Sequence, residues 1–280
     1  MKNEVSACRL GKTANSPVEG VVVIDTETTG LEPGKDEVLS IAIVDLDGNE
    51  LFYSLIRPLE RKRWPKATEV HGITWKDVKD KPTIYDVGNE VSEILENATL
   101  IVGYNVGFDM DMLTENGLPN VSTDRYDLME EFAHAYGRWS DRKCGYLWCK
   151  LEQCARHYKY EFSAHNALED AKATAHCYKM FREECAKMIP EAERREQEQR
   201  QQEERRKKEA DERRAADEAA AESTRKKKLI IKAICVVVSL VSVAVFLNSC
   251  TIAGGDIFGS LAVMVVSALV FFIGLCGLFI

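Results

Sequence analysis

The chain has 280 residues, enough for one sizeable domain and additional segments, and its formal net charge is −8. The negative charge comes mainly from residues 1–189, because the charged stretch that follows them is close to balanced in sign. A net acidic domain argues against a broad DNA-coating surface, since phosphate binding needs a basic footprint. It does not argue against a small metal-dependent site, in which a cation supplies the positive charge.

After a loose, flexible N-terminal arm over residues 1–17, an apolar and β-branched run over residues 21–24 predicts a buried strand. Asp25 and Glu27 follow at i and i+2, so their side chains point to the same face of that strand. Two carboxylates on one face are costly unless a cation lies between them, and oxygen ligands suit Mg²⁺ or Mn²⁺. Alternatively, the strand ends here and both acids are simply solvated, so the pattern needs further ligands from the rest of the chain.

The segments that follow predict an α/β domain over residues 18–189. Strands over residues 37–45 and 50–56 are joined by Asp47-Gly48-Asn49, a strong hairpin signal. A loop follows, and its basic cluster Arg61-Lys62-Arg63 either grips phosphates or is solvated. The remaining elements are a helix, a short strand and three more helices, over residues 83–97, 100–104, 108–116, 147–158 and 167–188. A three-stranded meander followed by strand–helix alternation predicts a mixed central sheet flanked by helices.

The composition changes abruptly at residue 190. Residues 190–228 are almost all charged, Gln or Ala, and acids repeatedly precede bases by four residues. No apolar a/d seam is present, which argues against a coiled coil. We therefore expect a charged linker that is either helical or disordered.

Residues 229–280 predict a transmembrane hairpin of two helices. The spans over residues 229–247 and 257–280 are long and apolar enough to cross a bilayer, and the residues between them predict a polar, Gly-rich loop. Arg225-Lys226-Lys227-Lys228 lies immediately before the first span, so the positive-inside rule predicts a multi-pass protein of the inner (cytoplasmic) membrane with its domain in the cytoplasm. Small residues in the tail permit a homo-oligomer without requiring one. The alternative is an apolar helical hairpin buried inside a globular protein.

Two later segments supply groups that can join the first two acids. Asp109 lies in the first turn of the helix that follows the strand over residues 100–104. A capping-box-like start to the last helix leaves His165 just before that helix and Asp170 just inside it. Four carboxylates and a histidine are the set that a two-metal hydrolase needs, because two cations clamp the reacting oxygens and a base takes a proton from water.

These residues resemble the DEDDh, or DnaQ-like, 3′–5′ exonucleases. Asp25-Thr26-Glu27, Asp109 in a Tyr-Asn-x-x-Phe-Asp setting, and His165 five residues before Asp170 are similar to the three motifs of that family in order and approximate spacing. Val70-His71-Gly72-Ile73-Thr74 is similar to a further element of its proofreading-type members. The resemblance covers roughly residues 18–185. It implies a ribonuclease H-like fold and stepwise release of nucleoside monophosphates from a 3′ end.

The resemblance also implies the catalytic roles. Asp25, Glu27, Asp109 and Asp170 would hold two Mg²⁺ or Mn²⁺ ions. His165 would be the general base that deprotonates the attacking water.

Six residues would contact the substrate on the same resemblance: Thr26, Glu27, Leu31, His71, Tyr104 and Phe108. The Thr26 backbone and Glu27 would meet the terminal 3′-hydroxyl, and Leu31 would lie beside the last base. Phe108 would pack against the terminal nucleotides. Many members place His where this chain has Tyr104, which puts the specificity in doubt more than the catalysis.

The sequence thus predicts a membrane-anchored, metal-dependent 3′–5′ exonuclease that acts on single-stranded DNA or RNA ends. The motifs do not distinguish DNA from RNA, because recognition of the 2′-hydroxyl depends on the cleft. One alternative is a catalytically silent nucleic-acid-binding or scaffold protein at the membrane, although all five catalytic positions are filled. Another is a phosphatase of the Asp-x-Asp type, which needs Asp at the position that Glu27 occupies.

Overall fold

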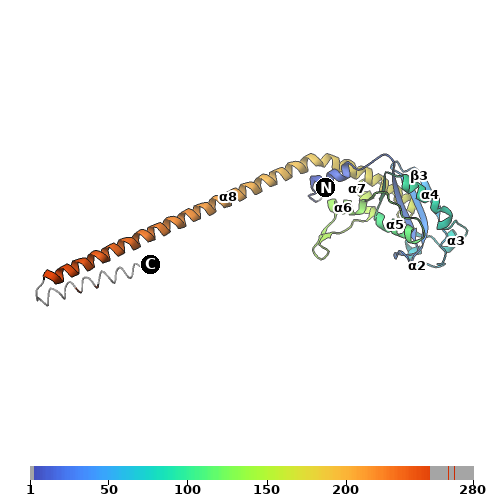
Figure 1. Cartoon of the computed structure of the whole chain (residues 1–280). Coiled ribbons are helices and arrows are strands. Elements are labelled where there is room, and N and C mark those ends of the chain that lie inside the picture. Colours follow the sequence, from blue (N-terminus) through green and yellow to red (C-terminus); the bar gives the residue numbers. More distant parts are fainter. Residues whose placement is uncertain (1–2, 253–263, 265–267, 269–280) are drawn as a thin grey trace. The chain divides into compact units, whose positions relative to one another are not determined.

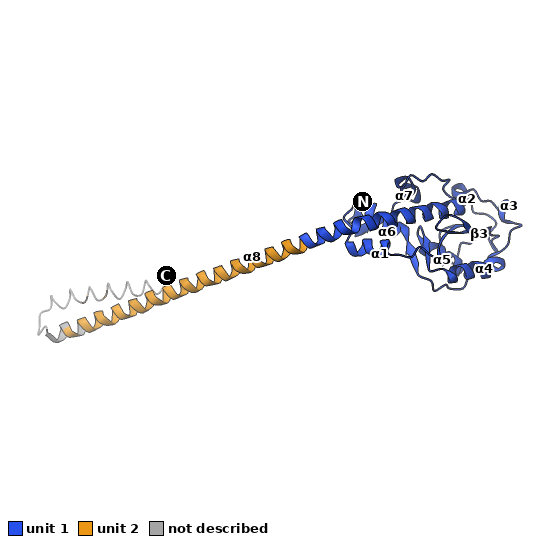
Figure 2. Cartoon of the chain, turned by 90° about the horizontal axis from the view of Figure 1, so that it is seen from above, with its two compact units in different colours: residues 1–198 blue, residues 199–280 orange. Residues whose placement is uncertain are grey.

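The computed structural model describes residues 3–252 together with residues 264 and 268. The chain divides into two compact units, Met1–Glu198 and Gln199–Ile280, which Figure 2 shows in different colours. All strands of the described chain lie in the first of these units, called unit 1 below.

Unit 1 is built on a five-stranded mixed sheet with the strand order β3-β2-β1-β4-β5. On one side of β1 (Val21–Thr28) lies the antiparallel strand β2 (Val38–Asp45), which pairs in turn with β3 (Glu50–Leu55). On the other side lies the parallel strand β4 (Leu100–Gly103), which pairs with β5 (Arg125–Asp127). This arrangement confirms the mixed α/β sheet with flanking helices that the sequence predicts.

Within the described residues, eight helices and a short hairpin accompany the sheet (Figure 1). The helices are α1 (Ala7–Ala14), α2 (Pro65–His71), α3 (Trp75–Val78), α4 (Ile84–Asn97), α5 (Val106–Glu115), α6 (Leu128–Tyr136), α7 (Leu151–His157) and α8 (Ala167–Ile252). The hairpin consists of β6 (Trp139–Ser140) and β7 (Gly145–Tyr146).

The alternation of side chains along β1 divides the core into two layers. Val21 and Val23 pack in the layer formed with α6, α7 and the first turns of α8. Val22 and Ile24 pack in the opposite layer, against α4 and α5. Because the period of a strand is two residues, the next odd-numbered side chains of β1 point to the layer that contains α8. The strand therefore directs its acids towards the start of that helix.

The N-terminal segment differs from the loose arm that the sequence predicts, because it folds as α1. Leu10 is only 2% exposed, and the hydroxyl of Thr13 lies 2.9 Å from that of Tyr126 on β5. The side chain of Arg9 donates to Glu131 of α6 at 2.7 Å. A helix of eight residues shows too little periodicity in sequence to reveal the apolar face that makes these contacts.

Helix α8 passes from the core of unit 1 into the second unit. It continues through Pro190 and through the whole of the predicted linker, so residues 190–228 are helical in the structure. It also includes residues 248–252, which the sequence assigns to a loop. One helix of the described chain, α8, contains a segment that is long and apolar enough to cross a membrane. The second predicted span, residues 257–280, lies outside the described residues except at positions 264 and 268.

Candidate active site

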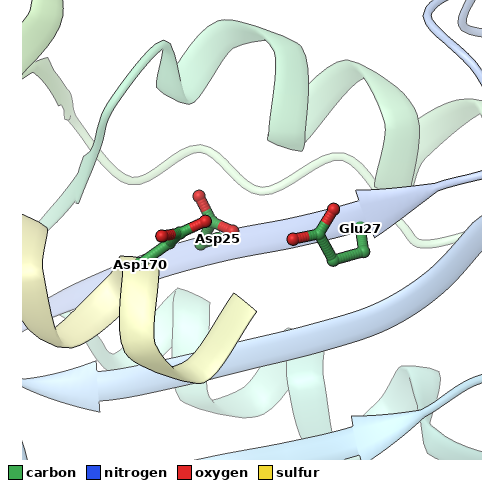
Figure 3. A group of neighbouring side chains, drawn as sticks. All are labelled: Asp25, Glu27 and Asp170. Carbon is green, nitrogen blue, oxygen red and sulfur yellow. The ribbon is translucent and has the colours of Figure 1, made fainter. Parts of the chain in front are cut away.

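The first two acids lie at the end of the central strand. Asp25 and Glu27 are half-buried and, as the alternation requires, come from one face of β1 (Figure 3). The register between β1 and β2 shifts directly after Glu27, which pairs with Ser40, whereas Thr28 pairs with Val38. Irregularities of this kind often lie next to active sites, where they redirect side chains or end the pairing.

The third acid comes from the first turn of α8. Asn166 starts this turn, because its backbone oxygen accepts from the N–H of Asp170 at 2.8 Å. One carboxylate oxygen of Asp170, Oδ2, accepts the backbone N–H of His165 at 3.0 Å. The other oxygen, Oδ1, is buried and has no hydrogen-bond partner. A buried carboxylate oxygen without a partner is costly, which makes Oδ1 of Asp170 a candidate ligand atom for a cation.

These three acids converge. One carboxylate oxygen each from Asp25, Glu27 and Asp170 can be chosen such that all three atoms lie within 4.8 Å of one another (Figure 3). These residues come from two separate elements, β1 and α8. We call Asp25, Glu27 and Asp170 the acidic group below.

The fourth acid, Asp109, lies beside the acidic group but not among its three converging residues. It is buried in the first turn of α5, and its Oδ1 accepts two hydrogen bonds from Thr26, from the backbone N–H at 3.0 Å and from the hydroxyl at 2.7 Å. The turn before α5 depends on Asn105, which has a φ of 76° and donates its N–H to Asp127 at 3.1 Å. Asp109 is close enough to Asp25 for its charge to raise the pKa of that residue.

All four acids have raised pKa values, and burial is the main cause in each case. The pKa of Asp25 lies well above its usual range, through burial and then through the charges of Asp109, Asp170 and Glu27. Burial and the charges of Asp170 and Asp109 raise the pKa of Glu27 to about 8. Burial raises the pKa values of Asp109 and Asp170 to about 7, although hydrogen bonds from Thr26 and from His165 oppose the rise. Carboxylates that repel one another in this way favour a cation between them.

His165 stands at the entrance to α8. Its side chain is exposed, and its φ of 67° places it in the left-handed region, which is uncommon for residues other than glycine. The bond from its N–H to Asp170 fixes the backbone beside the acidic group. The charge of His165 also lowers the pKa of His71, although burial lowers it more, so the two rings lie near each other.

His71 and Leu31 line a cavity of about 600 Å³ next to Glu27. The side chain of Leu31 is free to contact a ligand in this cavity, because it is among the most exposed apolar side chains of the described residues. Both ring nitrogens of His71 are instead engaged within the protein. Nδ1 accepts the N–H of Ile73 at 3.0 Å, and Nε2 lies 3.1 Å from the carbonyl oxygen of Thr28. The ring is therefore neutral with its proton on Nε2, and it ties the end of β1 to the loop after α2. Its predicted contact with the substrate stays a prediction.

Tyr104 and Phe108 lie on the path from β4 into α5, Tyr104 directly after the strand and Phe108 in the first turn of the helix. The hydroxyl of Tyr104 donates to the carbonyl oxygen of Cys149 at 2.8 Å. Phe108 is partly buried and packs against the core layer of α4 and α5. Both side chains are thus held by the fold, and their predicted substrate contacts stay predictions.

Asp36 and Lys66 of the cavity were missed by sequence reasoning. Asp36 is buried, pairs with Arg61 at 3.2 Å and accepts the N–H of Glu32 at 3.0 Å. This pair positions the basic loop at the cavity, where Lys66 also lies. The basic cluster in sequence was the available signal. Its partner Asp36 could not be identified, because an isolated acid in a turn carries no pattern.

The zinc site that the cysteines could form is not supported. Cys144, Cys149 and Cys154 recur at five-residue intervals near His157, but they lack the C-x₂-C spacing of zinc knuckles. Among the described residues, the acidic group is the one set of three or more His, Cys, Asp or Glu side chains that converges closely enough to hold a metal ion.

The donor set of the site fits divalent cations that prefer oxygen. The converging ligands are all carboxylates, and one of their oxygens is buried without a partner. Within residues 3–252, none of the salt bridges supplies a lysine or arginine to these four acids. Mg²⁺ and Mn²⁺ match such a set better than softer metals do.

Residues 22–178 of this chain match the family described as exonuclease, of the RNase T type. This match covers more than half of the chain and includes all four acids and His165. The chain belongs to this exonuclease family. Membership confirms the exonuclease class that the motifs predict.

Two curated relatives are similar over parts of their length. The PolC-type DNA polymerase III of Clostridium perfringens is 31% identical over 162 residues, which are 56% of this chain and 11% of that protein. The DNA polymerase III subunit epsilon of Rickettsia typhi is 32% identical over 97 residues, 33% of this chain and 42% of that protein. The exonuclease chain therefore spans less than half the length of these relatives.

Two solved structures are also similar. Exonuclease X, in complex with 5′ overhanging duplex DNA, is 26% identical and covers 57% of this chain and 90% of its own, with a TM-score of 0.45. Exonuclease I of E. coli, in complex with a dA16 oligonucleotide, is 21% identical and covers 59% of this chain and 42% of its own, with a TM-score of 0.48.

Proposed function

We propose that unit 1 is a metal-dependent 3′–5′ exonuclease that hydrolyses single-stranded DNA or RNA ends to nucleoside monophosphates. The acidic group is the observation that carries this proposal. It brings together acids from β1 and α8, leaves a buried oxygen of Asp170 without a partner, and lies within the region that matches the exonuclease family.

Asp25, Glu27 and Asp170 would hold two Mg²⁺ or Mn²⁺ ions, together with Asp109. When bound, such ions supply the positive charge that stabilises the attacking and leaving oxygens of a phosphodiester. Thr26 would orient Asp109, because both hydrogen-bond donors of this threonine meet one oxygen of that carboxylate.

His165 would be the general base. Its ring would take a proton from the attacking water and release it to solvent, which its exposure permits. The N–H bond to Asp170 keeps the backbone of His165 near the acidic group while the ring remains free to turn.

The cavity next to Glu27 would receive the terminal nucleotide. Leu31 would cover one side of the last base, and Arg61 and Lys66 bring positive charge to the same cavity. Tyr104 and Phe108 would pack against the nucleotide, and Thr26 and Glu27 would meet the 3′-hydroxyl. His71 would act at the wall of this cavity.

A second part of the proposal concerns the membrane. Between residues 229 and 245, α8 exposes apolar side chains nearly all round, and Arg225-Lys226-Lys227-Lys228 precedes them. This supports a first span over residues 229–247, with unit 1 in the cytoplasm at the inner membrane. The second span and a homo-oligomer through both spans stay predictions from the sequence.

The test of the proposed function is a side-by-side digestion by the full chain in detergent with Mn²⁺. Matched single-stranded DNA, single-stranded RNA and duplex substrates are compared, with the His165→Ala chain as the control. We expect mononucleotides from the single strands and a large loss of rate in the variant. A wild-type chain that binds these strands but leaves them intact would instead indicate a silent nucleic-acid-binding protein.

A further inference from the structure

Two tryptophan side chains are exposed in the segment between α6 and α7. Trp139 is 53% exposed and Trp148 is 66% exposed, whereas Trp64 is buried at 4%. The segment of residues 138–150, called the aromatic–basic hairpin below, contains both. In Figure 1 its yellow-green strands extend away from the body of unit 1.

The same segment is basic within an acidic domain. Residues 138–150 include four lysines or arginines and one acid, Asp141, which accepts the indole N–H of Trp139 at 2.9 Å. The ammonium group of Lys143 lies 5.6 Å from the centroid of the Trp148 ring. An exposed indole with a cation beside it is the combination that binds single-stranded nucleic acid, because the ring stacks on a base and the cation attracts a phosphate.

The hairpin is joined at its C-terminal end to Tyr104, for which the sequence predicts a substrate contact. The carbonyl oxygen of Cys149, next to Trp148, accepts the hydroxyl of Tyr104, which directly precedes the turn into α5. Three residues further on, Glu152 in the first turn of α7 is near enough for its charge to raise the pKa of Asp170. Trp148 thus directly precedes the residue that binds Tyr104, four positions before Glu152.

We propose that the aromatic–basic hairpin binds the single-stranded nucleic acid that leads to the 3′ end, with Trp148 stacking on a base and Lys143 near a phosphate. This inference rests on the proposed function of the acidic group. A lipid surface would also accept tryptophan and lysine. The hydrogen bond to Tyr104, for which the sequence predicts a substrate contact, and the positive charge beside an exposed ring favour nucleic acid.

The experiment compares two substrates of different length with the full chain in detergent. The p-nitrophenyl ester of thymidine 5′-monophosphate occupies only the acidic group and its cavity, whereas a single-stranded oligonucleotide also reaches the hairpin. Trp148→Ala should raise the KM for the oligonucleotide by at least about 5-fold, the lower limit for loss of one stacked base. The KM for the ester should stay unchanged, and Trp148→Phe should restore most of the affinity for the oligonucleotide.

Tyr85→Ala is the matched control, because Tyr85 on α4 is also 66% exposed but belongs to the opposite layer of unit 1. Lys143→Ala should weaken the salt dependence of oligonucleotide binding, by about 0.7 in the logarithmic slope for one lost phosphate contact. The Tyr85→Ala chain should match the wild type in both measurements.

An unchanged oligonucleotide KM in Trp148→Ala would overturn the proposal, as would an equal rise for both substrates. A second measurement uses bilayers of brominated anionic lipid, which quench the fluorescence of tryptophans that touch them. If Trp148→Phe removes this quenching and oligonucleotide does not relieve it, the hairpin binds the lipid surface and the proposal is overturned too.

If the wild-type chain cleaves neither substrate, the proposed function fails, and direct measurement of oligonucleotide binding then tests the hairpin. Weaker oligonucleotide binding by Trp148→Ala would then support the hairpin, and equal binding would reject it.

Discussion

At the scale of single residues, the site depends on the alternation of side chains along β1. Asp25 and Glu27 point towards α8, and Thr26 between them points to the opposite layer, where it meets Asp109 of α5. Neighbouring residues of β1 thus face both α5, which carries Asp109, and α8, which carries Asp170. Both donors of Thr26 meet Oδ1 of Asp109, and in the proposed function the other oxygen of that carboxylate would meet a cation.

Thr26→Val should weaken Mn²⁺ binding by about 10- to 100-fold, the usual effect of removing a group that orients a metal ligand. The substitution keeps the shape of the side chain and the backbone N–H, and removes only the hydroxyl donor. Thr26→Ser restores that donor and should bind Mn²⁺ as the wild type does. Isothermal titration calorimetry measures both, and tight Mn²⁺ binding by Thr26→Val would show that the hydroxyl does not position Asp109.

His165→Ala should lower the rate of hydrolysis by about 10²- to 10⁴-fold, the range expected for a lost general base. Mn²⁺ affinity should persist, because the carboxylates remain in place. Added imidazole should restore part of the rate as its concentration rises. A variant that keeps the wild-type rate would exclude His165 as the base.

The metal-free protein should lose stability as the pH rises from about 5 to about 8. The pKa values of Glu27 and Asp170 are raised to about 8 and about 7, so the folded state holds protons that the unfolded state has already released. Saturating Mg²⁺ should therefore raise the melting temperature more at pH 8 than at pH 5. Thermal melts with EDTA or Mg²⁺ measure this difference, and Asp170→Asn should reduce it. An Mg²⁺ effect that is the same at all pH values would contradict the electrostatic origin of the site.

At the scale of elements, α1 belongs to the fold of unit 1. Leu10 and Ala14 are buried in the same core layer as α6 and α8, and Arg9 pairs with the nearly buried Glu131. The side chain of Asn3, just before α1, donates to the carbonyl oxygens of His134 and Gly137 near the end of α6. The N-terminal segment therefore stabilises the helix that precedes the aromatic–basic hairpin.

Leu10→Ala should destabilise unit 1 by about 2–5 kcal/mol, the usual cost of truncating a buried leucine. Leu10 is 2% exposed, whereas Val18, a few residues later, is 48% exposed. Val18→Ala is the control and should change the free energy of unfolding by less than about 0.5 kcal/mol. Urea denaturation of both variants measures the difference, and equal stabilities would mean that α1 is not part of the core.

The larger elements and the acids were predictable from sequence, because their signals are local. The alternation at Asp25 and Glu27 and the capped start of α8 lie within a few residues each. The three-residue strand β5, the two-residue strands of the hairpin and the eight-residue helix α1 are too short to show a period. The bond from Thr26 to Asp109 joins residues 83 positions apart, and no local pattern reports such a contact.

At the scale of the whole chain, the exonuclease region is followed by a segment of very different composition. The family match ends at residue 178, and the second unit begins at Gln199 with a charged helix that becomes apolar after Lys228. Side chains such as Leu229 and Leu240 are exposed, which would be unfavourable in water and is favourable in lipid. The proposed anchor would hold the nuclease near the inner membrane without changing its chemistry.

The full chain should remain in the membrane fraction after washing with alkaline carbonate, which releases proteins that are bound only by charge. A chain that ends at Thr224 lacks the basic cluster and the apolar segment and should leave that fraction. If the full chain is released by the wash, α8 does not span the bilayer.

The most direct test of the central claim follows the length of a 5′-labelled single-stranded oligonucleotide with time, with Mn²⁺ and with EDTA. We predict stepwise shortening from the 3′ end that requires Mn²⁺, that Asp170→Asn abolishes, and that the neighbouring Glu169→Gln leaves intact. Glu169 pairs with Lys172 rather than with the acidic group, which makes it the matched control. Shortening that persists in EDTA or in Asp170→Asn, or immediate release of the 5′ label, would contradict a metal-dependent 3′–5′ exonuclease at this site.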